Sequence, residues 1–419
     1  MSQAPRFRTV LSCSLLLASL GAGVAACGGP DSSPLSSTPF DAAGQISFSG
    51  PKGSGKAADP NKPLEVTIKN GSGRITDVTA TDATGRQLAG ELSADGSRWH
   101  STASLAAGAH YTVRVSTEDG RGQPGTRMFR FDTKSSSNRL NATFGPEKGV
   151  YGVGQPITAQ LSAPVKAKAD RAKVERALKV TSVPAADGAW YWVDSKTLHF
   201  RPKEYWPAHA TIKVRSNLNG IKIAGKLYGG DAKPLTITTG DRLEALANAG
   251  SDQMVVKRNG KVINTIPITM GKPGFSTRNG VKVVLGKTRY VRMTSSSIGI
   301  AAGSSDSYDL PVYFATQVTW SGEYVHAAPW SVGSQGYANT SHGCTGMSMD
   351  NATWFFNHFR KGDIVNVTGS EGATMTPFDN GFGDWNLSWD KWRKGSALSA
   401  GKQADSTPAE TARLQPAAF

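Results

Sequence analysis

Short alternating segments separated by turns are the feature that most constrains the fold of this chain. In the first 240 residues, apolar and polar side chains alternate over short runs, and turns such as Asn70-Gly71, Thr84-Gly85 and Asp95-Gly96 separate them. A period of two is typical of strands that bury one face, and regularly spaced turns favour a β-sandwich. The strand candidates lie at 64–68, 111–115, 129–131, 157, 190–193, 198–200, 212–214 and 235–237.

These runs fall into two blocks of similar style, followed by a third block of different character. The length of 419 residues agrees with two to four domains, at about 150 residues for each. We therefore expect a mainly β chain that begins with two immunoglobulin-like β-sandwiches, at 44–140 and 141–240. The cysteine pair of antibody domains is absent, so the prediction rests on strand spacing. A short helical insertion is expected at 166–178.

The third block, 241–370, is predicted to be a mostly-β domain with a short helix. Asn259-Gly260 lies between two apolar runs and is a strong hairpin signal, because both turn residues accept a positive φ. Ser348 can cap a helix over 349–359, with Gly362 as its stop. Trp354, Phe355 and Phe359 on this helix are expected to pack in the core. The expected strands are 253–256, 262–268, 281–285, 312–318 and 364–367.

The C-terminal region begins with a cluster of three tryptophans, Trp385, Trp389 and Trp392. We expect residues 371–394 to form a Trp-rich cap packed against the third block, with sugar binding as the alternative. Residues 395–419 are rich in Ala, Ser, Gln and Pro, and this composition predicts a disordered tail.

The N-terminus has the features of a bacterial export signal. Arg6 and Arg8 precede an apolar stretch that ends in Val24-Ala25-Ala26-Cys27. Small residues before Cys27 resemble a lipobox, in which the thiol receives a diacylglycerol, so residues 1–26 are predicted to be a lipoprotein signal peptide. An ordinary secretory signal is the alternative. Residues 27–43 then form a flexible tether, and the protein is expected on the outer face of the cytoplasmic membrane, facing the cell wall.

The net charge of +15 suggests a polyanionic partner. Lys and Arg are scattered along the chain, and the sequence shows no basic helix, zinc-finger spacing or aromatic RNA-binding motif. We therefore favour general attraction to an anionic cell wall or membrane surface over nucleic-acid binding.

Cys344 is the residue most suited to chemistry. The chain has three cysteines; Cys13 leaves with the signal and Cys27 carries the lipid, so Cys344 has no partner for a disulfide. His342 and His326 lie within 18 residues of it. Three interpretations remain open from the residues alone: a Cys–His nucleophile pair, a zinc site of His326, His342 and Cys344, or a buried structural cysteine with two chance histidines.

The segments around Cys344 resemble a known family. Tyr324-Val325-His326 and Ser341-His342-Gly343-Cys344 resemble the signature of L,D-transpeptidases with a YkuD-like catalytic domain, and the flanking segments resemble actinobacterial members over residues 243–394. Those flanking segments are 267–272, 277–280, 327–331 and 383–386. The resemblance favours the Cys–His interpretation and implies a YkuD-like fold for the third block.

The resemblance also implies roles for individual residues. Cys344 corresponds to the acylated nucleophile, and His326 to its general base, held by a backbone carbonyl where the family often has Ser in place of Ala327. The N–H groups of Gly343 and Cys344 correspond to oxyanion donors. The remaining expected contacts are Tyr308 as a lid residue that assists the oxyanion hole, Met293 and Trp330 as pocket walls, and Ser341 and His342 as donors near the thiolate. One departure is Gly346, where the family usually has Asn.

The implied reaction is peptidoglycan cross-linking. A stem-peptide donor acylates the cysteine, D-Ala leaves, and the side-chain amine of an acceptor stem resolves the thioester to a 3→3 cross-link. The resemblance implies no metal and no organic cofactor, and it implies inhibition by carbapenem β-lactams. The alternatives are an L,D-carboxypeptidase on the same scaffold, since the sequence does not distinguish water from amine as acceptor, and a non-catalytic wall-binding lipoprotein.

Overall fold

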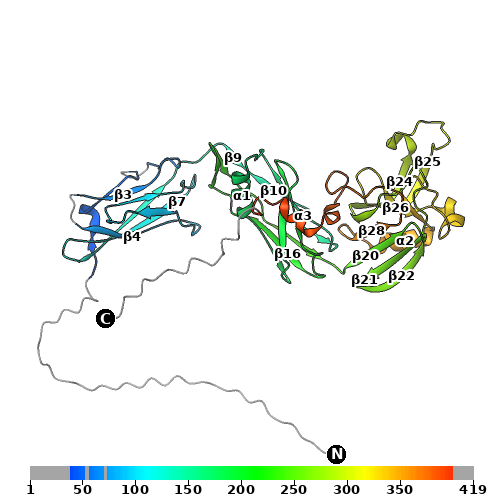
Figure 1. The fold of residues 1–419 in the computed structure, drawn as a ribbon, viewed down its shortest axis with the longest axis horizontal. Helices are drawn as coiled ribbons and strands as arrows, with labels where there is room; N and C mark the ends of the chain where they lie inside the picture. The colour runs from blue at the N-terminus through cyan, green and yellow to red at the C-terminus, as the bar shows by residue number, and fades with distance from the viewer. Residues whose placement is uncertain (1–37, 52–55, 70–72, 400–419) are drawn as a thin grey trace, which may run out of the picture.

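Three β-rich domains lie in a row in chain order (Figure 1). The computed structural model describes residues 38–51, 56–69 and 73–399. The predicted signal peptide, Cys27, most of the tether and the Asn70-Gly71 turn lie outside the described residues. Within the described residues, no helix is long and apolar enough to cross a membrane.

The N-terminal domain is a β-sandwich, as the alternating runs predict. Its core lies between two four-stranded sheets and includes Val66, Trp99 and Val113. One sheet has the order β1 (Phe40–Asp41), β8 (Pro124–Asp132), β7 (His110–Glu118) and β4 (Arg74–Asp82). The other has the order β2 (Ile46–Phe48), β3 (Glu65–Ile68), β6 (Arg98–Ser101) and β5 (Gly90–Leu92). The parallel pairing of β1 with β8 places the start of the domain before the predicted boundary at 44, because Phe40 opposes Gly125.

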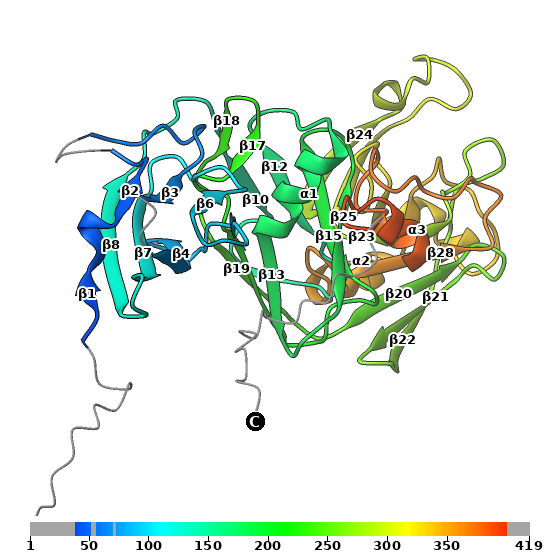
Figure 2. The same ribbon diagram turned by 60° about the vertical axis from the view of Figure 1, so that its left-hand side comes forward.

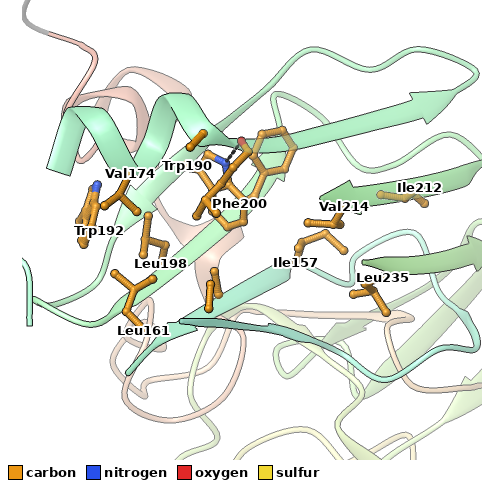
Figure 3. Packing of buried hydrophobic residues seen from close by; sticks show 14 of the residues in the cluster. Ile157, Leu161, Val174, Trp190, Trp192, Leu198, Phe200, Ile212, Val214 and Leu235 are labelled. Atoms are coloured by element: carbon orange, nitrogen blue, oxygen red, sulfur yellow. Dashed lines mark hydrogen bonds between the residues drawn. The ribbon is translucent and has the colours of Figure 1, made fainter. Parts of the chain in front are cut away.

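The middle domain is a second sandwich with its own core. Figure 3 shows Trp190, Leu198 and Phe200 packed with residues of the facing sheet, and the Trp190 indole donates to the Leu178 carbonyl at 3.2 Å. One sheet has the order β10 (Ala142–Gly145), β12 (Ile157–Leu161), β15 (Thr197–Pro202) and β14 (Gly188–Trp192). The other has the order β11 (Val150–Tyr151), β19 (Leu235–Thr239), β16 (Thr211–Ser216) and β13 (Leu178–Val183).

The predicted helical insertion in this domain is α1 (Lys168–Ala177), which buries Val174 in the core. A small third sheet joins β17 (Lys222–Ala224), β18 (Leu227–Gly229) and β9 (Arg139–Leu140). Figure 2 shows the β17–β18 hairpin beside the first sandwich. The Tyr228 hydroxyl donates to the Asn61 side chain at 2.9 Å across this junction.

The C-terminal domain combines two sheets with one main helix. The five-stranded sheet has the order β22 (Lys261–Pro267), β21 (Gln253–Arg258), β20 (Leu243–Asn248), β28 (Ile364–Thr368) and β23 (Gly280–Val283). The four-stranded sheet has the order β24 (Gly286–Thr294), β25 (Asp309–Gln317), β26 (Tyr324–Ala327) and β27 (Thr345–Met347). The predicted hairpin is confirmed, since Asn259 and Gly260 have φ angles of 50° and 82° between β21 and β22.

The helix α2 (Met349–His358) begins where the capping signal predicts. The Ser348 side chain accepts a hydrogen bond from the Asn351 N–H, which satisfies one free donor of the first turn. Phe355 and Phe359 are buried in the core of this domain, as expected. The Trp354 ring is partly buried and packs against the same core.

The predicted Trp-rich cap contacts the third block, as expected, and also the middle domain. It contains η4 (Asp384–Asn386) and α3 (Trp389–Lys394), and Figure 1 shows α3 over the middle domain. The Trp392 indole donates to the Ala189 carbonyl at 2.9 Å. The Arg201 guanidinium, also in the middle domain, lies 4.6 Å from the Trp392 ring and 4.8 Å from the Trp385 ring. The cap therefore packs against the third block, where the Asn386 side chain accepts a hydrogen bond from the Val281 N–H at 2.8 Å, and the middle sandwich supplies further aromatic and cationic partners.

The predicted start of the disordered tail was also wrong. Glu175 is buried and accepts hydrogen bonds from the Ser396 hydroxyl, from the Ala397 N–H at 2.8 Å and from the Trp192 indole at 3.2 Å. A buried carboxylate needs such donors, and they fix residues 396–397 on the middle domain. Residues 400–419 lie outside the described residues.

Candidate active site

A cavity of about 960 Å³ in the C-terminal domain contains the chemistry-bearing residues. The β24–β25 hairpin forms one wall, β26 supplies His326, and the segment before β27 supplies Cys344. All predicted catalytic and substrate-binding residues line this one cavity: Met293, Tyr308, His326, Trp330, Ser341, His342, Gly343 and Cys344. The fold thus brings together residues that are up to 51 positions apart (344 − 293 = 51).

The local backbone explains how Cys344 meets His326. Strand β26 pairs in parallel with β27, with His326 opposite Gly346, and Cys344 directly precedes β27. The nucleophile segment is also fixed from its other side, because the Ser341 N–H donates to the Met270 carbonyl at 2.9 Å. Both contacts are backbone hydrogen bonds, and they fix the segment that carries the thiol on two sides.

The Cys344 thiol is protonated in the resting site. Its Sγ donates to the Gly322 carbonyl at 3.6 Å. Burial raises the pKa of Cys344 to about 11, and the negative charge of Glu323 acts in the same direction. The nucleophile therefore needs a base at the moment of attack.

His326 has the geometry of that base. The side chain is buried, and its Nδ1 lies 2.8 Å from the Ala327 carbonyl oxygen. Because a carbonyl only accepts, Nδ1 carries the proton and Nε2 is left as the acceptor. Burial also lowers the pKa of His326, so the ring is neutral near pH 7. The predicted backbone carbonyl is thus that of the neighbouring residue, and no Ser hydroxyl is needed.

The His342 ring contacts two aromatic side chains that line the cavity, Phe275 and Tyr308. Its ring centroid lies 4.7 Å from that of Phe275 and 4.9 Å from that of Tyr308. Its Nε2 is 3.7 Å from the Asp306 carboxylate, which pairs with Lys272 at 2.6 Å. Burial lowers the pKa of His342, and the charge of Lys272 adds to this effect. His342 therefore contacts Tyr308, the residue expected to act as a lid.

The predicted oxyanion role of Gly343 needs a correction. Its N–H donates to the Ser341 hydroxyl at 3.1 Å, so this donor is occupied in the resting site. The φ of Gly343 is +116°, a conformation that favours glycine, and this explains the residue type. The same Ser341 hydroxyl donates to the Cys344 carbonyl at 2.6 Å. Ser341 thus organises the nucleophile turn.

Three charged residues of the site were not found from the sequence. Glu323 lines the cavity and pairs with Arg278 at 2.9 Å and with Lys282. Lys282 is 1% exposed although its strand, β23, is otherwise apolar at the buried positions. A lysine between Val281 and Val283 was the one available signal, since a buried ammonium group requires a carboxylate partner.

The zinc alternative has no support from the arrangement. Across residues 38–51, 56–69 and 73–399, no three His, Cys, Asp or Glu side chains converge as metal ligands. His326 and Cys344 have the partners described above, Ala327 and Gly322.

Comparison with known proteins agrees with this site. Residues 244–367 match the L,D-transpeptidase catalytic domain family, YkuD, and residues 55–222 match the bacterial Ig domain family in one stretch that crosses both sandwiches. L,D-transpeptidase 2 of Mycobacterium tuberculosis strain CDC 1551 is 37% identical over 80% of this chain and 81% of its own length. The chain belongs to the L,D-transpeptidase family. The predicted fold class and enzyme class are thereby confirmed.

Other relatives match about half of this L,D-transpeptidase. L,D-transpeptidase 1 of Mycobacterium tuberculosis strain H37Rv is 40% identical over 54% of this chain and 84% of its own length. A solved structure of an L,D-transpeptidase in complex with imipenem is 37% identical, with a TM-score of 0.47, over 55% of this chain and 99% of that one.

Gly346 is explained by close packing in this L,D-transpeptidase. A Cβ atom at this position would lie 2.9 Å from the Ala328 Cβ and 3.1 Å from the Thr269 Cγ2. The space beside β27 is therefore closed to a side chain. The cavity wall at this point consists of backbone, so an amide side chain cannot orient the substrate from Gly346.

Proposed function

We propose that this L,D-transpeptidase forms 3→3 cross-links between peptidoglycan stem peptides through a thioester on Cys344. The observation that carries the proposal is a protonated thiol and a neutral imidazole with a free Nε2 in one cavity. This pair can move one proton from sulfur to nitrogen as a bond to carbon forms.

The first half-reaction transfers the acyl group to the enzyme. The Cys344 sulfur attacks the carbonyl between the diamino residue and the terminal D-Ala of the donor, while His326 Nε2 takes the thiol proton. Cys344 and Tyr308 both line the cavity, and in this proposal the Cys344 N–H and the Tyr308 hydroxyl stabilise the oxyanion. His326 then gives its proton to the D-Ala amine, the C–N bond breaks, and the thioester remains.

The second half-reaction resolves the thioester. The side-chain amine of an acceptor stem attacks the carbonyl, His326 removes a proton from that amine, and the C–S bond breaks with return of the proton to sulfur. The proposed cycle uses residues of this chain alone, with no metal ion or organic cofactor. If water replaces the amine, the same steps give an L,D-carboxypeptidase.

Product analysis tests this proposal. Protein lacking residues 1–27 is incubated with a disaccharide-tetrapeptide, and mass spectrometry follows released D-Ala and dimers. Dimers linked between two diamino residues support the transpeptidase, whereas tripeptide without dimers identifies the carboxypeptidase. If the wild-type protein releases no D-Ala and thus behaves as the Cys344→Ala control does, the non-catalytic wall-binding alternative is supported.

We also propose that Cys27 carries a lipid that holds the protein on the outer face of the cytoplasmic membrane. The support is the sequence Val24-Ala25-Ala26-Cys27 after an apolar stretch. The two sandwiches would then separate the catalytic domain from the bilayer, since the three domains lie in a row (Figure 1). Cys27→Ala is expected to move the protein from the membrane fraction to the soluble fraction, and unchanged membrane association would refute the anchor.

A further inference from the structure

An ion cluster forms part of the floor of the catalytic cavity. Glu323 receives two cations: Arg278 Nη1 lies 2.9 Å from its Oε1, and Lys282 Nζ contacts its Oε2. The backbone N–H of Arg278 also donates to the same Oε1, at 3.2 Å. Arg278 and Glu323 line the cavity, and Lys282 on β23 is buried behind them.

The cluster of Arg278, Lys282 and Glu323 carries a net positive charge when Lys282 is protonated, because two cations and one carboxylate then sum to +1. Burial lowers the pKa of Lys282, and the carboxylate of Glu323 offsets part of that shift. The other ionisable groups that line the cavity are neutral near pH 7, because burial raises the pKa values of Cys344 and Tyr308 and lowers those of His326 and His342. The formal charges of an Arg–Glu pair alone would sum to zero. Lys282 therefore leaves the charge of Arg278 uncompensated, which suits an anionic ligand.

The Arg278 guanidinium also has N–H donors that are available to a ligand. Its contacts with Glu323 and with Ser321 use Nη1, at 2.9 and 3.4 Å, while the side chain is 44% exposed. No contact among the described residues uses its Nε or Nη2. A guanidinium presents paired N–H groups that match the two oxygens of a carboxylate. Because Glu323 already holds this side chain in place, a ligand does not have to order it.

The position of the cluster relative to Cys344 indicates which carboxylate of the donor Arg278 could bind. Ser321 and Glu323 flank Gly322, whose carbonyl accepts from the Cys344 thiol. The guanidinium thus contacts the side chains of both neighbours of Gly322, and Arg278 and Cys344 line the same cavity. In the donor, the carboxylate of the leaving residue follows the attacked carbonyl by one residue, a step of about 3.8 Å along the chain.

We infer that Arg278 binds the terminal carboxylate of the donor's leaving residue, and that Glu323 and Lys282 are positioning residues for its guanidinium. The inference rests on the proposed function, since it concerns the donor of that reaction. It makes the enzyme selective for donors that end in a free carboxylate.

Two donors that differ in one group test the inference. Disaccharide-tetrapeptides ending in D-Ala or in D-alaninamide are compared on the wild type, Arg278→Gln, Arg278→Lys and the control Arg289→Gln, which removes an exposed charge on β24. Arg278→Gln should lower kcat/KM for the acid donor by about 10- to 100-fold, the range for a lost charge-assisted hydrogen bond, mainly through KM. The amide donor should change little, and Arg278→Lys should recover part of the loss.

A binding measurement separates this inference from the proposed function. Calorimetric titration of Cys344→Ala, which retains Arg278, should show tighter binding of the acid donor than of the amide donor. Equal affinities, or equal losses for both donors in Arg278→Gln, would overturn the inference. If the acid is preferred in binding but the wild type releases no D-Ala, the subsite stands and the proposed reaction fails. Equal affinities in Cys344→Ala overturn the inference even if Arg278→Gln does not fold.

Discussion

The ionisation of Cys344 leads to a prediction that needs no substrate. Its pKa is raised from 9.0 to about 11, so at pH 8 about one molecule in 1,000 carries a thiolate. An ordinary thiol with a pKa of 9.0 is about one-tenth ionised at that pH. Alkylation of the folded protein by iodoacetamide should therefore be about 100-fold slower than alkylation of the same thiol in the denatured chain.

The pH profile makes the prediction sharper. Because the folded pKa lies above the working range, the alkylation rate should rise about tenfold for each pH unit from 7 to 10. Acylation by a donor depends instead on neutral His326, whose pKa is lowered, so its rate should be level from pH 7 upward to pH 9 and fall only below the usual histidine value of 6.5. The two reactions of one sulfur atom should thus have different pH profiles.

The assay is simple because Cys344 is the one cysteine in residues 28–419. Protein lacking residues 1–27 is treated with iodoacetamide at pH 6 to 10, and the adduct is counted by mass spectrometry, with Cys344→Ala as the blank. His326→Ala should alkylate at nearly the wild-type rate. A plateau in alkylation at about pH 7 would refute the reasoning, because it would show a thiolate–imidazolium pair in the free enzyme.

Three further predictions concern single side chains. His326→Ala should lower donor acylation by about 10²- to 10⁴-fold, the usual contribution of a positioned base, and His342→Ala should cost less; the opposite order in steady-state rates would reverse the two roles. A carbapenem should add once, with the mass of the intact drug, to Cys344, and peptide mapping that finds the drug elsewhere, or equal labelling of Cys344→Ser, would contradict this. Trp392→Ala should destabilise the protein by about 3–5 kcal/mol in thermal unfolding, since Trp392 is fully buried, whereas the half-exposed Trp320→Ala should cost far less; equal losses would show that the cap does not hold the domains together.

The strands and the hairpin were predictable because they depend on local patterns. A period of two identified several strands of both sandwiches, among them β7, β8, β15 and β16, but not β4. Asn259-Gly260 predicted the β21–β22 turn through its positive φ angles. The capping residue Ser348 located the start of α2. From the residues alone, a Cys–His pair was one of three interpretations of Cys344 and His326, and the resemblance of the surrounding segments to the L,D-transpeptidase family favoured it.

The packing of the C-terminal cap on the middle domain could not be predicted from the residues of the cap. Tryptophans pack on any apolar surface, and the partner that selects the middle domain, Ala189, lies 203 positions before Trp392. The segment after 395 appears polar in the sequence, yet the buried Glu175 carboxylate supplies its hydrogen-bond partner from 221 positions away. A fragment that starts at 241 would expose Trp392, so we expect one that starts at 141 to be the smaller stable unit.

The ion cluster of Arg278, Lys282 and Glu323 shows why buried ion pairs are hard to predict from sequence. The pKa of Lys282 is lowered by burial and restored in part by Glu323, so neither residue is tolerable at its position without the other. Removing Glu323 would leave a buried ammonium group, at a cost of about 3–5 kcal/mol, and would confuse a loss of fold with a loss of recognition. Arg278 differs, because its side chain is partly exposed and its removal leaves Glu323 still paired with Lys282. Substitution of Arg278 therefore separates binding of the substrate from stability of the domain, which the two buried members of the cluster cannot do.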